Sequence, residues 1–231
     1  MSNKKHTPNK KTTDIGPVYL DCNATTPLDP AVGDVMRHYL EEEYGNEGSR
    51  THEFGARAKQ AVQRARDQVG AVVGCQRDEV LFTSGATESN NLALLGLAAH
   101  GERTGKKHLV TTLIEHKAVL EPVDELEKRG FEVTRVGCGA DGRVCLAALM
   151  EAIRGDTLVV SLMQVNNETG VRQPVLELAE ALASGKHEAY LHVDAAQGFG
   201  KELESLRHSR VDLISVSGHK VFGPKGVGAL I

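Results

Sequence analysis

Residues 107–136 read KHLVTTLIEHKAVLEPVDELEKRGFEVTRV, and this stretch predicts the fold of the chain. Its two ends, residues 107–112 and 131–136, are short apolar runs with β-branched side chains, which are typical of buried strands. Residues 115–130 between them are expected to form a helix. A strand, a helix and a second strand in this order indicate a βαβ unit, in which the two strands run parallel. We therefore expect a mostly parallel sheet with helices on both faces.

The same alternation continues in both directions along the chain. Further strands are predicted at residues 79–85, 157–163, 189–194 and 212–217. Further helices are predicted at residues 87–99, near 145–153 and near 175–184. Upstream, apolar residues between Ala58 and Val73 recur at helical spacing, which predicts a long amphipathic helix that ends at Gly74. Residues 18–231 are therefore expected to form one α/β domain.

Composition narrows the class of protein. The 231 residues are 40% hydrophobic, which is enough for a buried core, and the net charge of −4 argues against a nucleic-acid or anionic membrane surface. Residues 1–17 hold four lysines and one acidic residue, and we predict that they form a disordered polar leader. No stretch approaches the roughly 18 apolar residues of a membrane span. A cytoplasmic location is the expectation.

The four cysteines give no sign of a metal site or of a disulfide framework. They are Cys22, Cys75, Cys138 and Cys145, without a CxxC pair or a spacing that suits zinc. We expect them to be reduced thiols that are either buried or incidental.

In a parallel α/β sheet, ligands bind outside the carboxyl ends of the strands, so polar residues that follow apolar runs deserve inspection. Residues 84–89, SGATES, combine small side chains with the start of a helix, which suits a phosphate group or a plain N-cap at Thr87. His116 follows the strand at 107–112 and is either a capping or core residue or part of a site. Residues 166–168, NNE, are typical of a polar turn.

Two further strands end in residues that carry chemistry. Asp194 closes the strand at 189–194, and a buried aspartate there needs a capping role, a bound cation or a protonated ring nitrogen. Ser217, His219 and Lys220 follow the last predicted strand. A lysine, an acid and a phosphate cup on one sheet edge are what pyridoxal 5'-phosphate requires, because this cofactor forms a Schiff base with a lysine.

The chain also resembles the cysteine desulfurases, a family within the class V aminotransferase group of fold type I pyridoxal-phosphate enzymes. The resemblance extends from about Val18 to Ile231 and matches the subgroup that serves iron–sulfur clusters and thiolation. The motifs that carry it are YLDCNATTP (19–27), FTSGATESNN (82–91), EHKAVL (115–120), VNNETGV (165–171), HVDAAQ (192–197) and SGHKVFGPKGVGAL (217–230). It implies that residues 18–231 are the large, cofactor-binding domain of such an enzyme.

The resemblance implies a role for each site residue. Lys220 is expected to hold the cofactor as a Schiff base and to move the Cα proton of the substrate. His116 is expected to stack on the cofactor ring and to exchange a proton with the substrate thiol. Asp194 would pair with the ring nitrogen and Gln197 with the phenolic oxygen. The residues expected to contact the phosphate are Ala86, Thr87, Ser217 and His219, and Asn167 is expected to contact cofactor or substrate.

The implied reaction converts L-cysteine to L-alanine and passes the sulfur to an enzyme cysteine as a persulfide. The resemblance further implies a homodimer and a sulfur-acceptor or scaffold protein, serving iron–sulfur cluster assembly, tRNA thiolation or DNA phosphorothioation, with no direct binding of nucleic acid. In this family the nucleophilic cysteine and a small C-terminal domain follow the lysine motif. We therefore expect this chain to be truncated, to bind the cofactor and to make no persulfide alone.

Two alternatives remain open at this point. A selenocysteine lyase or another class V enzyme would share the lysine and the aspartate. The other alternative is a non-enzymatic remnant that binds a sulfur-carrier protein. Such a protein would have no catalytic activity and would not require the missing cysteine. Cys22 lies in a motif where the family varies, and it is a weak candidate for the nucleophile.

Overall fold

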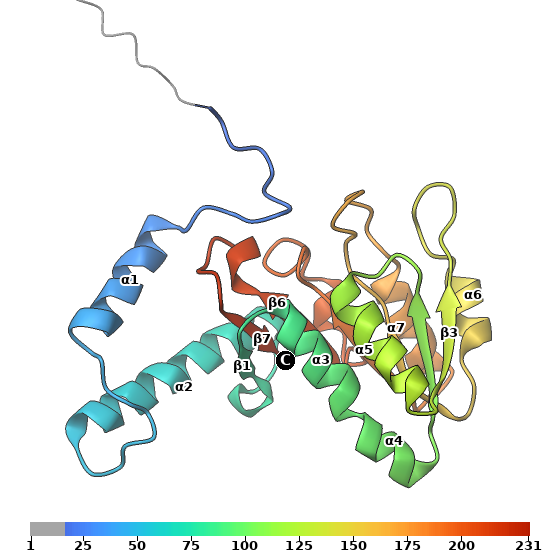
Figure 1. Ribbon diagram of the computed structural model, residues 1–231, viewed down its shortest axis with the longest axis horizontal. Helices are drawn as coiled ribbons and strands as arrows, with labels where there is room; N and C mark the ends of the chain where they lie inside the picture. The colour runs from blue at the N-terminus through green and yellow to red at the C-terminus, as the bar shows by residue number, and fades with distance from the viewer. Residues whose placement is uncertain (1–16) are drawn as a thin grey trace, which may run out of the picture.

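A seven-stranded sheet forms the centre of the protein in this computed structural model, which describes residues 17–231 (Figure 1). The strands are β1 (Leu81–Thr83), β2 (His108–Thr112), β3 (Glu132–Val136), β4 (Thr157–Ser161), β5 (Tyr190–Asp194), β6 (Leu213–Ser217) and β7 (Gly228–Leu230). Their order is β1-β7-β6-β5-β4-β2-β3; β7 pairs antiparallel with β1 and β6, and the other neighbouring strands pair in parallel. The predicted mostly parallel sheet is confirmed. The predicted leader lies outside the described residues apart from Pro17.

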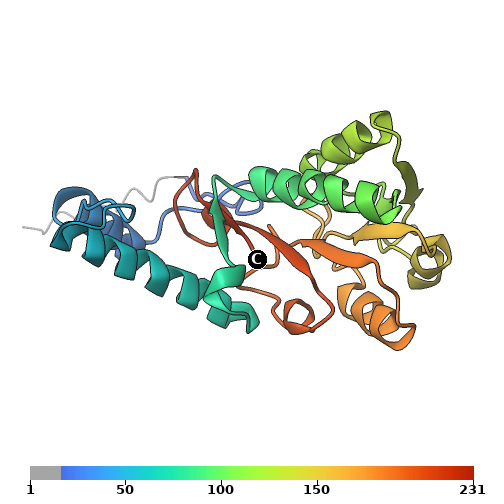
Figure 2. The same cartoon turned by 90° about the horizontal axis from the view of Figure 1, so that it is seen from below.

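Helices cover both faces of the sheet (Figure 2). The α-helices are α1 (Pro30–Glu41), α2 (Glu53–Val73), α3 (Ala86–Gly96), α4 (Ala98–Thr104), α5 (Lys117–Lys128), α6 (Leu146–Ala152) and α7 (Val175–Ser184). Three 3₁₀ turns are η1 (Arg77–Glu79), η2 (Ser205–Arg207) and η3 (Gly218–Lys220). One apolar cluster lies under α3 and α5, and a larger one lies under α6, α7 and the end of α2. Burial of both sheet faces explains why the strands read as continuous apolar runs.

Most predicted elements form, and the differences have local causes. The expected strand at 79–85 shortens to β1 because η1 occupies its start. The expected helix at 87–99 divides into α3 and α4 at Leu97. The long helix α2 ends at Gly74 as predicted, with a left-handed φ of 87°.

Two elements were not predicted. Helix α1 begins with an Asp29 side chain that accepts a hydrogen bond from the Ala31 amide, followed by Pro30 at the first helical position. That capping signal was present in the sequence. Strand β7 has only three residues, which is too short for an apolar pattern that would predict a strand. It forms because it pairs with β1 on one side and with β6 on the other.

A buried histidine fastens the middle of the sheet. His192 on β5 hydrogen-bonds through its two ring nitrogens to Ser161 Oγ on β4 (2.8 Å) and to Ser215 Oγ on β6 (3.0 Å). Burial lowers the pKa of His192 to about 4, so the ring is neutral near pH 7. The pair of contacts fixes β5 between its neighbours close to its carboxyl end.

The four cysteines form no disulfide in the structure. All four cysteines are free; Cys22, Cys138 and Cys145 are exposed and Cys75 is half-buried, so three of the four are not core residues. None of the helices in residues 17–231 combines the length and the apolar character that a membrane span requires.

We predict that Gly228→Ala lowers the free energy of unfolding by about 1–3 kcal/mol, the usual cost of overpacking. A Cβ at Gly228 would lie 2.5 Å from the Cα of Gly85, which leads into α3, so backbone would have to move. Urea denaturation of the purified variant measures the change. Gly96→Ala is the matched control, because a Cβ there meets nothing within 4 Å. Equal stability of the two variants would contradict the close packing of β7 against Gly85.

Candidate functional site

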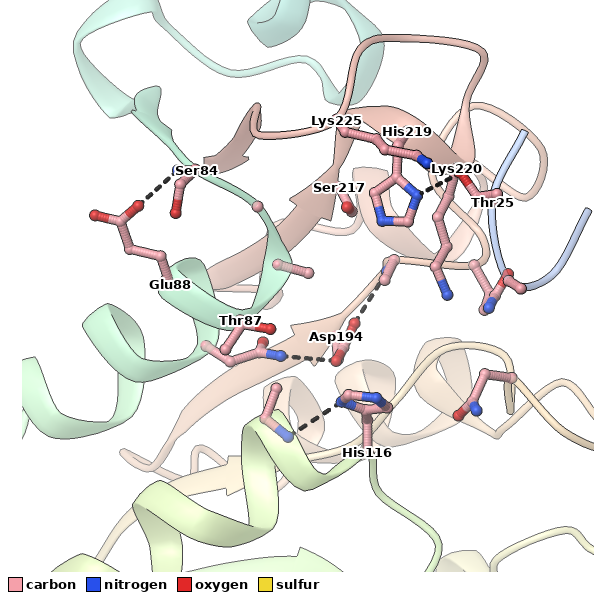
Figure 3. A pocket seen from close by; sticks show the side chains of 18 of the residues that line it. Thr25, Ser84, Thr87, Glu88, His116, Asp194, Ser217, His219, Lys220 and Lys225 are labelled. Carbon is pink, nitrogen blue, oxygen red and sulfur yellow. Dashed lines mark hydrogen bonds between the residues drawn. The ribbon is translucent and has the colours of Figure 1, made fainter. Parts of the chain in front are cut away.

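A cleft of about 590 Å³ opens at the carboxyl ends of β2, β4, β5 and β6 (Figure 3). All nine residues predicted for the site line it. They are Ala86, Thr87, His116, Asn167, Asp194, Gln197, Ser217, His219 and Lys220. The topology explains this convergence, because parallel strands bring the residues that follow them to one edge.

One end of the cleft is built to receive an anion. Gly85 caps α3 with a φ of 150° and without a side-chain cap, so first-turn N–H groups at Ala86 and Thr87 stay available to a ligand. The Ser217 hydroxyl lies 3.9 Å from the position that a Cβ on Gly85 would take. The N-cap is therefore Gly85, and the alternative of a plain cap at Thr87 is wrong.

Glu88 does not occupy this anion site. Its Oε2 accepts a hydrogen bond of 2.6 Å from the Ser84 amide, which lowers the pKa of the Glu88 carboxyl. In Figure 3 the side chain turns toward Ser84 and away from His219. The negative charge is therefore held to one side of the helix start.

Asp194 lies at the floor of the cleft and is 5% exposed. Its Oδ1 accepts from the Ala196 amide (3.0 Å), and its Oδ2 accepts from Asn90 Nδ2 (2.8 Å). Burial raises the pKa of Asp194, although these hydrogen bonds and the nearby His116 and Lys220 act in the opposite direction. The capping role that the sequence left open for Asp194 is present, because Oδ1 accepts the Ala196 amide. Each carboxylate oxygen also keeps a lone pair that can accept from a cation.

Asn90 was not predicted as a site residue. It is fully buried on α3, one turn after Ala86 and Thr87, so it shares their face of the helix. This i+3 and i+4 spacing was a signal that the sequence offered. Its Oδ1 has no hydrogen-bond partner within residues 17–231, which leaves a buried acceptor in the wall of the cleft.

His116 combines two of the roles that the sequence left open. It is the N-cap of α5, and its Nδ1 accepts a hydrogen bond from the Ala118 amide (3.1 Å). Because Nδ1 acts as an acceptor, the proton of the neutral ring is on Nε2. The ring faces Asp194 in Figure 3, so Nε2 is the nitrogen available for proton exchange in the cleft.

Lys220 extends into the cleft from η3, directly after β6. Its side chain converges with those of Asp194 and His116 on one space (Figure 3). Burial lowers the pKa of Lys220, and the charge of Lys201 acts in the same direction, against the opposing effects of Asp194 and Asp21. A lowered pKa leaves more of the amine unprotonated, which is the nucleophilic form.

The wall opposite α3 comes from turns and from the N-terminal segment. Asn166 accepts hydrogen bonds from the Glu168 and Thr169 amides, which confirms the polar turn and leaves Asn167 facing the cleft. Gln197 Nε2 donates to the Asn23 carbonyl (2.9 Å). The residues from this segment that line the cleft, Ala24 and Thr25, were not predicted.

A second buried carboxyl lies beneath the cleft and was also not predicted. Glu115 Oε1 accepts from the Met163 amide (2.6 Å) and from Thr112 Oγ1 (3.2 Å), while Oε2 has no partner within the described chain. Burial, followed by the charge of Asp194, raises the pKa of Glu115 to about 8. Glu115 is therefore mainly a neutral acid at pH 7. Its contact with Met163 ties the loop of His116 to the end of β4.

These groups fit pyridoxal 5'-phosphate. The uncapped start of α3 suits its phosphate, the free lone pairs of Asp194 suit a protonated ring nitrogen, and the Lys220 amine suits its aldehyde. A metal does not fit as well. Residues 17–231 contain no group of three His, Cys, Asp or Glu side chains that could hold a metal ion.

We predict that the titration of Glu115 makes the fold less stable as the pH rises from about 5 to 8. The folded protein keeps a proton with a pKa of about 8, whereas the unfolded chain releases it near 4.5, so folding takes up a proton in this window. Glu115→Gln should remove this part of the slope, which amounts to at most about 5 kcal/mol. Urea midpoints measured across pH 5–8 test it.

The matched control for this experiment is Glu121→Gln, which removes an exposed carboxyl from α5, the helix that begins two residues after Glu115. This variant should keep the slope of the unsubstituted protein. If Glu115→Gln also keeps that slope, Glu115 is not a neutral acid in the folded protein.

Comparison with known proteins places the chain in a family. The aminotransferase class V family matches residues 18–231. Human cysteine desulfurase is 49% identical over 216 residues, which are 94% of this chain and 47% of the human protein. The cysteine desulfurase IscS of Neisseria meningitidis is 48% identical over 214 residues, 93% of this chain and 52% of its own length. The chain thus spans about half the length of these curated relatives.

Solved structures agree with this assignment. DndA from Streptomyces lividans is 56% identical, with a TM-score of 0.82 over 93% of this chain and 59% of DndA. A structure described as SspA in complex with cysteine is 38% identical, with a TM-score of 0.83 over 92% of this chain and 60% of SspA. The sheet, the cleft and the matched family model lead to one assignment: this chain belongs to the class V aminotransferase family, with the fold of the type I pyridoxal-phosphate enzymes.

Proposed function

We propose that the protein is a pyridoxal-phosphate-dependent cysteine desulfurase. Class V aminotransferases and cysteine desulfurases use this cofactor. The observation that carries the proposal is the meeting of the Lys220 amine, the buried Asp194 carboxyl and the uncapped start of α3 in one cleft. The reaction would convert L-cysteine and an acceptor thiol to L-alanine and an acceptor persulfide. The sulfur moves from the substrate Cβ to the acceptor sulfur, and the thiol proton remains with the products.

Different residues of the cleft would hold the phosphate, the ring nitrogen and the phenolic oxygen of the cofactor. The phosphate would lie against Ala86, Thr87, Ser217 and His219. Asp194 would hold the proton on the ring nitrogen, Gln197 would donate to the phenolic oxygen and Asn167 would contact cofactor or substrate. When bound, the cofactor supplies an electron sink that weakens the bonds at the substrate Cα.

Two side chains would move protons. Lys220 would take the proton from the substrate Cα and return a proton to the product, which a half-buried amine with a lowered pKa can do. His116 would exchange a proton with the substrate thiol through Nε2, since Nδ1 is occupied by the Ala118 amide. The two groups reach the same space beside Asp194, so one substrate can meet both.

We also propose the finer features of this function. A homodimer is supported by α1, which buries none of its residues and exposes Val35 and Leu40 at its surface. The proposed reaction needs a sulfur acceptor, and we propose an acceptor or scaffold protein that serves iron–sulfur cluster assembly, tRNA thiolation or DNA phosphorothioation. Four free cysteines favour a reducing compartment such as the cytoplasm, although a Drosophila melanogaster relative is named as mitochondrial.

We predict that Lys220→Ala abolishes covalent capture of pyridoxal phosphate. The unsubstituted protein should form a coloured adduct, and after borohydride reduction mass spectrometry should find the pyridoxyl mass on the peptide that contains Lys220. Lys128→Ala is the control, because this exposed lysine lies at the far end of α5. The same adduct in Lys220→Ala, or none in the unsubstituted protein, would refute the role of Lys220.

We predict that this chain alone, with its cofactor bound, makes no persulfide and releases little or no alanine from L-cysteine, even when dithiothreitol is added. Alanine release is expected from a form of the protein that also carries the acceptor cysteine, and the variant and the substrates are compared in that form. Asp194→Asn should slow alanine release at least about tenfold, because the amide does not hold a proton on the ring nitrogen. The measurement is alanine by chromatography, with L-selenocysteine and L-kynurenine as competing substrates. Release from either competitor without release from L-cysteine would assign another class V activity.

A further inference from the structure

The motif at residues 19–27 has no role in the chemistry described above, and yet it lies against the loop that carries Lys220. We call residues 23–29 the N-terminal strap. Its backbone and side chains meet residues 219–222, which are almost two hundred positions later in the chain. Figure 3 shows Thr25 of the strap close to His219 and Lys220.

Thr26 makes the central contacts of the strap. Its Oγ1 donates to the His219 carbonyl (2.9 Å) and accepts from the Phe222 amide (2.8 Å). Its own amide also donates to the His219 carbonyl (2.9 Å). Thr26 is buried, so the hydroxyl uses its donor and its acceptor away from bulk water. One side chain thus connects the residue before Lys220 to the residue two positions after it.

Phe222 has a backbone conformation that needs such support. Its φ is 62°, in the left-handed region that bulky residues rarely adopt, and its ring is exposed rather than packed in the core. Its amide is held by Thr26 and its carbonyl accepts from the Asp29 amide (2.9 Å). The Gly223 amide donates to the Gly218 carbonyl (2.9 Å), which closes the loop around Lys220.

The strap has two further attachments at the same edge of the sheet. Thr25 Oγ1 hydrogen-bonds to His219 Nδ1 (3.0 Å), and the Asn23 carbonyl accepts from Gln197 Nε2 (2.9 Å). Both partners line the cleft. The strap therefore contacts the ends of β5 and β6 together, and Thr26 contacts the backbone on both sides of Lys220.

We propose that Thr26 is a positioning residue for Lys220: its hydroxyl holds the strained loop 218–223 in the one conformation that directs the lysine amine into the cleft. This proposal rests on the proposed function of Lys220. Without the strap the loop would relax from the left-handed conformation at Phe222, since the strap supplies the hydrogen bonds to both the amide and the carbonyl of that residue. The amine would then sample several positions instead of one, which costs reactivity.

The test compares Thr26→Val with Thr26→Ser. Valine keeps the shape of threonine but leaves the Phe222 amide without an acceptor, whereas serine keeps the hydroxyl. Hydrogen exchange at the Phe222 amide should become about tenfold faster in Thr26→Val and change little in Thr26→Ser, as expected for one lost hydrogen bond. Covalent capture of pyridoxal phosphate by Lys220 should be several-fold slower in Thr26→Val alone.

Each outcome decides the proposal. Unchanged exchange at Phe222 in Thr26→Val, or faster exchange with an unchanged rate of capture, would overturn it. If Thr26→Val does not fold, the unsubstituted protein still gives an answer, because a Phe222 amide that exchanges as fast as a free peptide would exclude the contact. Failure of the proposed function is distinct: the unsubstituted protein would then capture no cofactor, while the exchange measurement would be unaffected.

Discussion

The burial of the Asp194 carboxyl is the constraint on which the rest of the site depends. β5 lies in the interior of the sheet, and His192 fastens it to both neighbouring strands, so the end of β5 has little freedom to turn Asp194 toward water. Two N–H donors, from Ala196 and Asn90, offset only part of the cost of removing a charge from water. A cation at the remaining lone pairs would offset more of it. The cleft therefore favours a ligand with a protonated ring nitrogen, and the lysine and the helix start lie at suitable places for the rest of that ligand.

Two buried carboxyls, those of Glu115 and Asp194, lie close together at the floor of the cleft. The charge of Asp194 raises the cost of ionising Glu115. His116 and Lys220 lower the pKa of Asp194 against the effect of burial, whereas neither is among the influences on the pKa of Glu115. With a pKa of about 8, Glu115 is mainly neutral near pH 7. A neutral Glu115 can then connect the His116 loop to β4 without competing with Asp194 for the bound ring.

The sequence was sufficient to predict the parallel sheet and most of the helices, because these follow from local apolar periodicity and from the topology of βαβ units. The nine site residues came from the resemblance to the cysteine desulfurases, and the sheet topology explains why they meet at one edge. It was not sufficient for residues whose role depends on contacts between distant segments. Asn90 reads as an ordinary helix residue until the end of β5 lies beside it. Glu115 stands at the start of the predicted helix, and its contact with the Met163 amide, just after β4, is not recorded in the local sequence. Strand β7 and the contacts of Thr26 depend on partners far away in the chain, which no local pattern records.

The same long-range contacts add to the entropic cost of forming the site. β6 and β7 pair antiparallel on either side of the lysine loop, and β7 lies between β6 and β1. Pairing of β7 with β1 brings together residues that are far apart in the sequence. Closing such a long loop costs conformational entropy that the formation of a local helix does not cost. The strained φ of Phe222 adds a local cost that only the assembled strap and sheet can offset. The position of Lys220 therefore depends on contacts that join the first and last described segments of the chain.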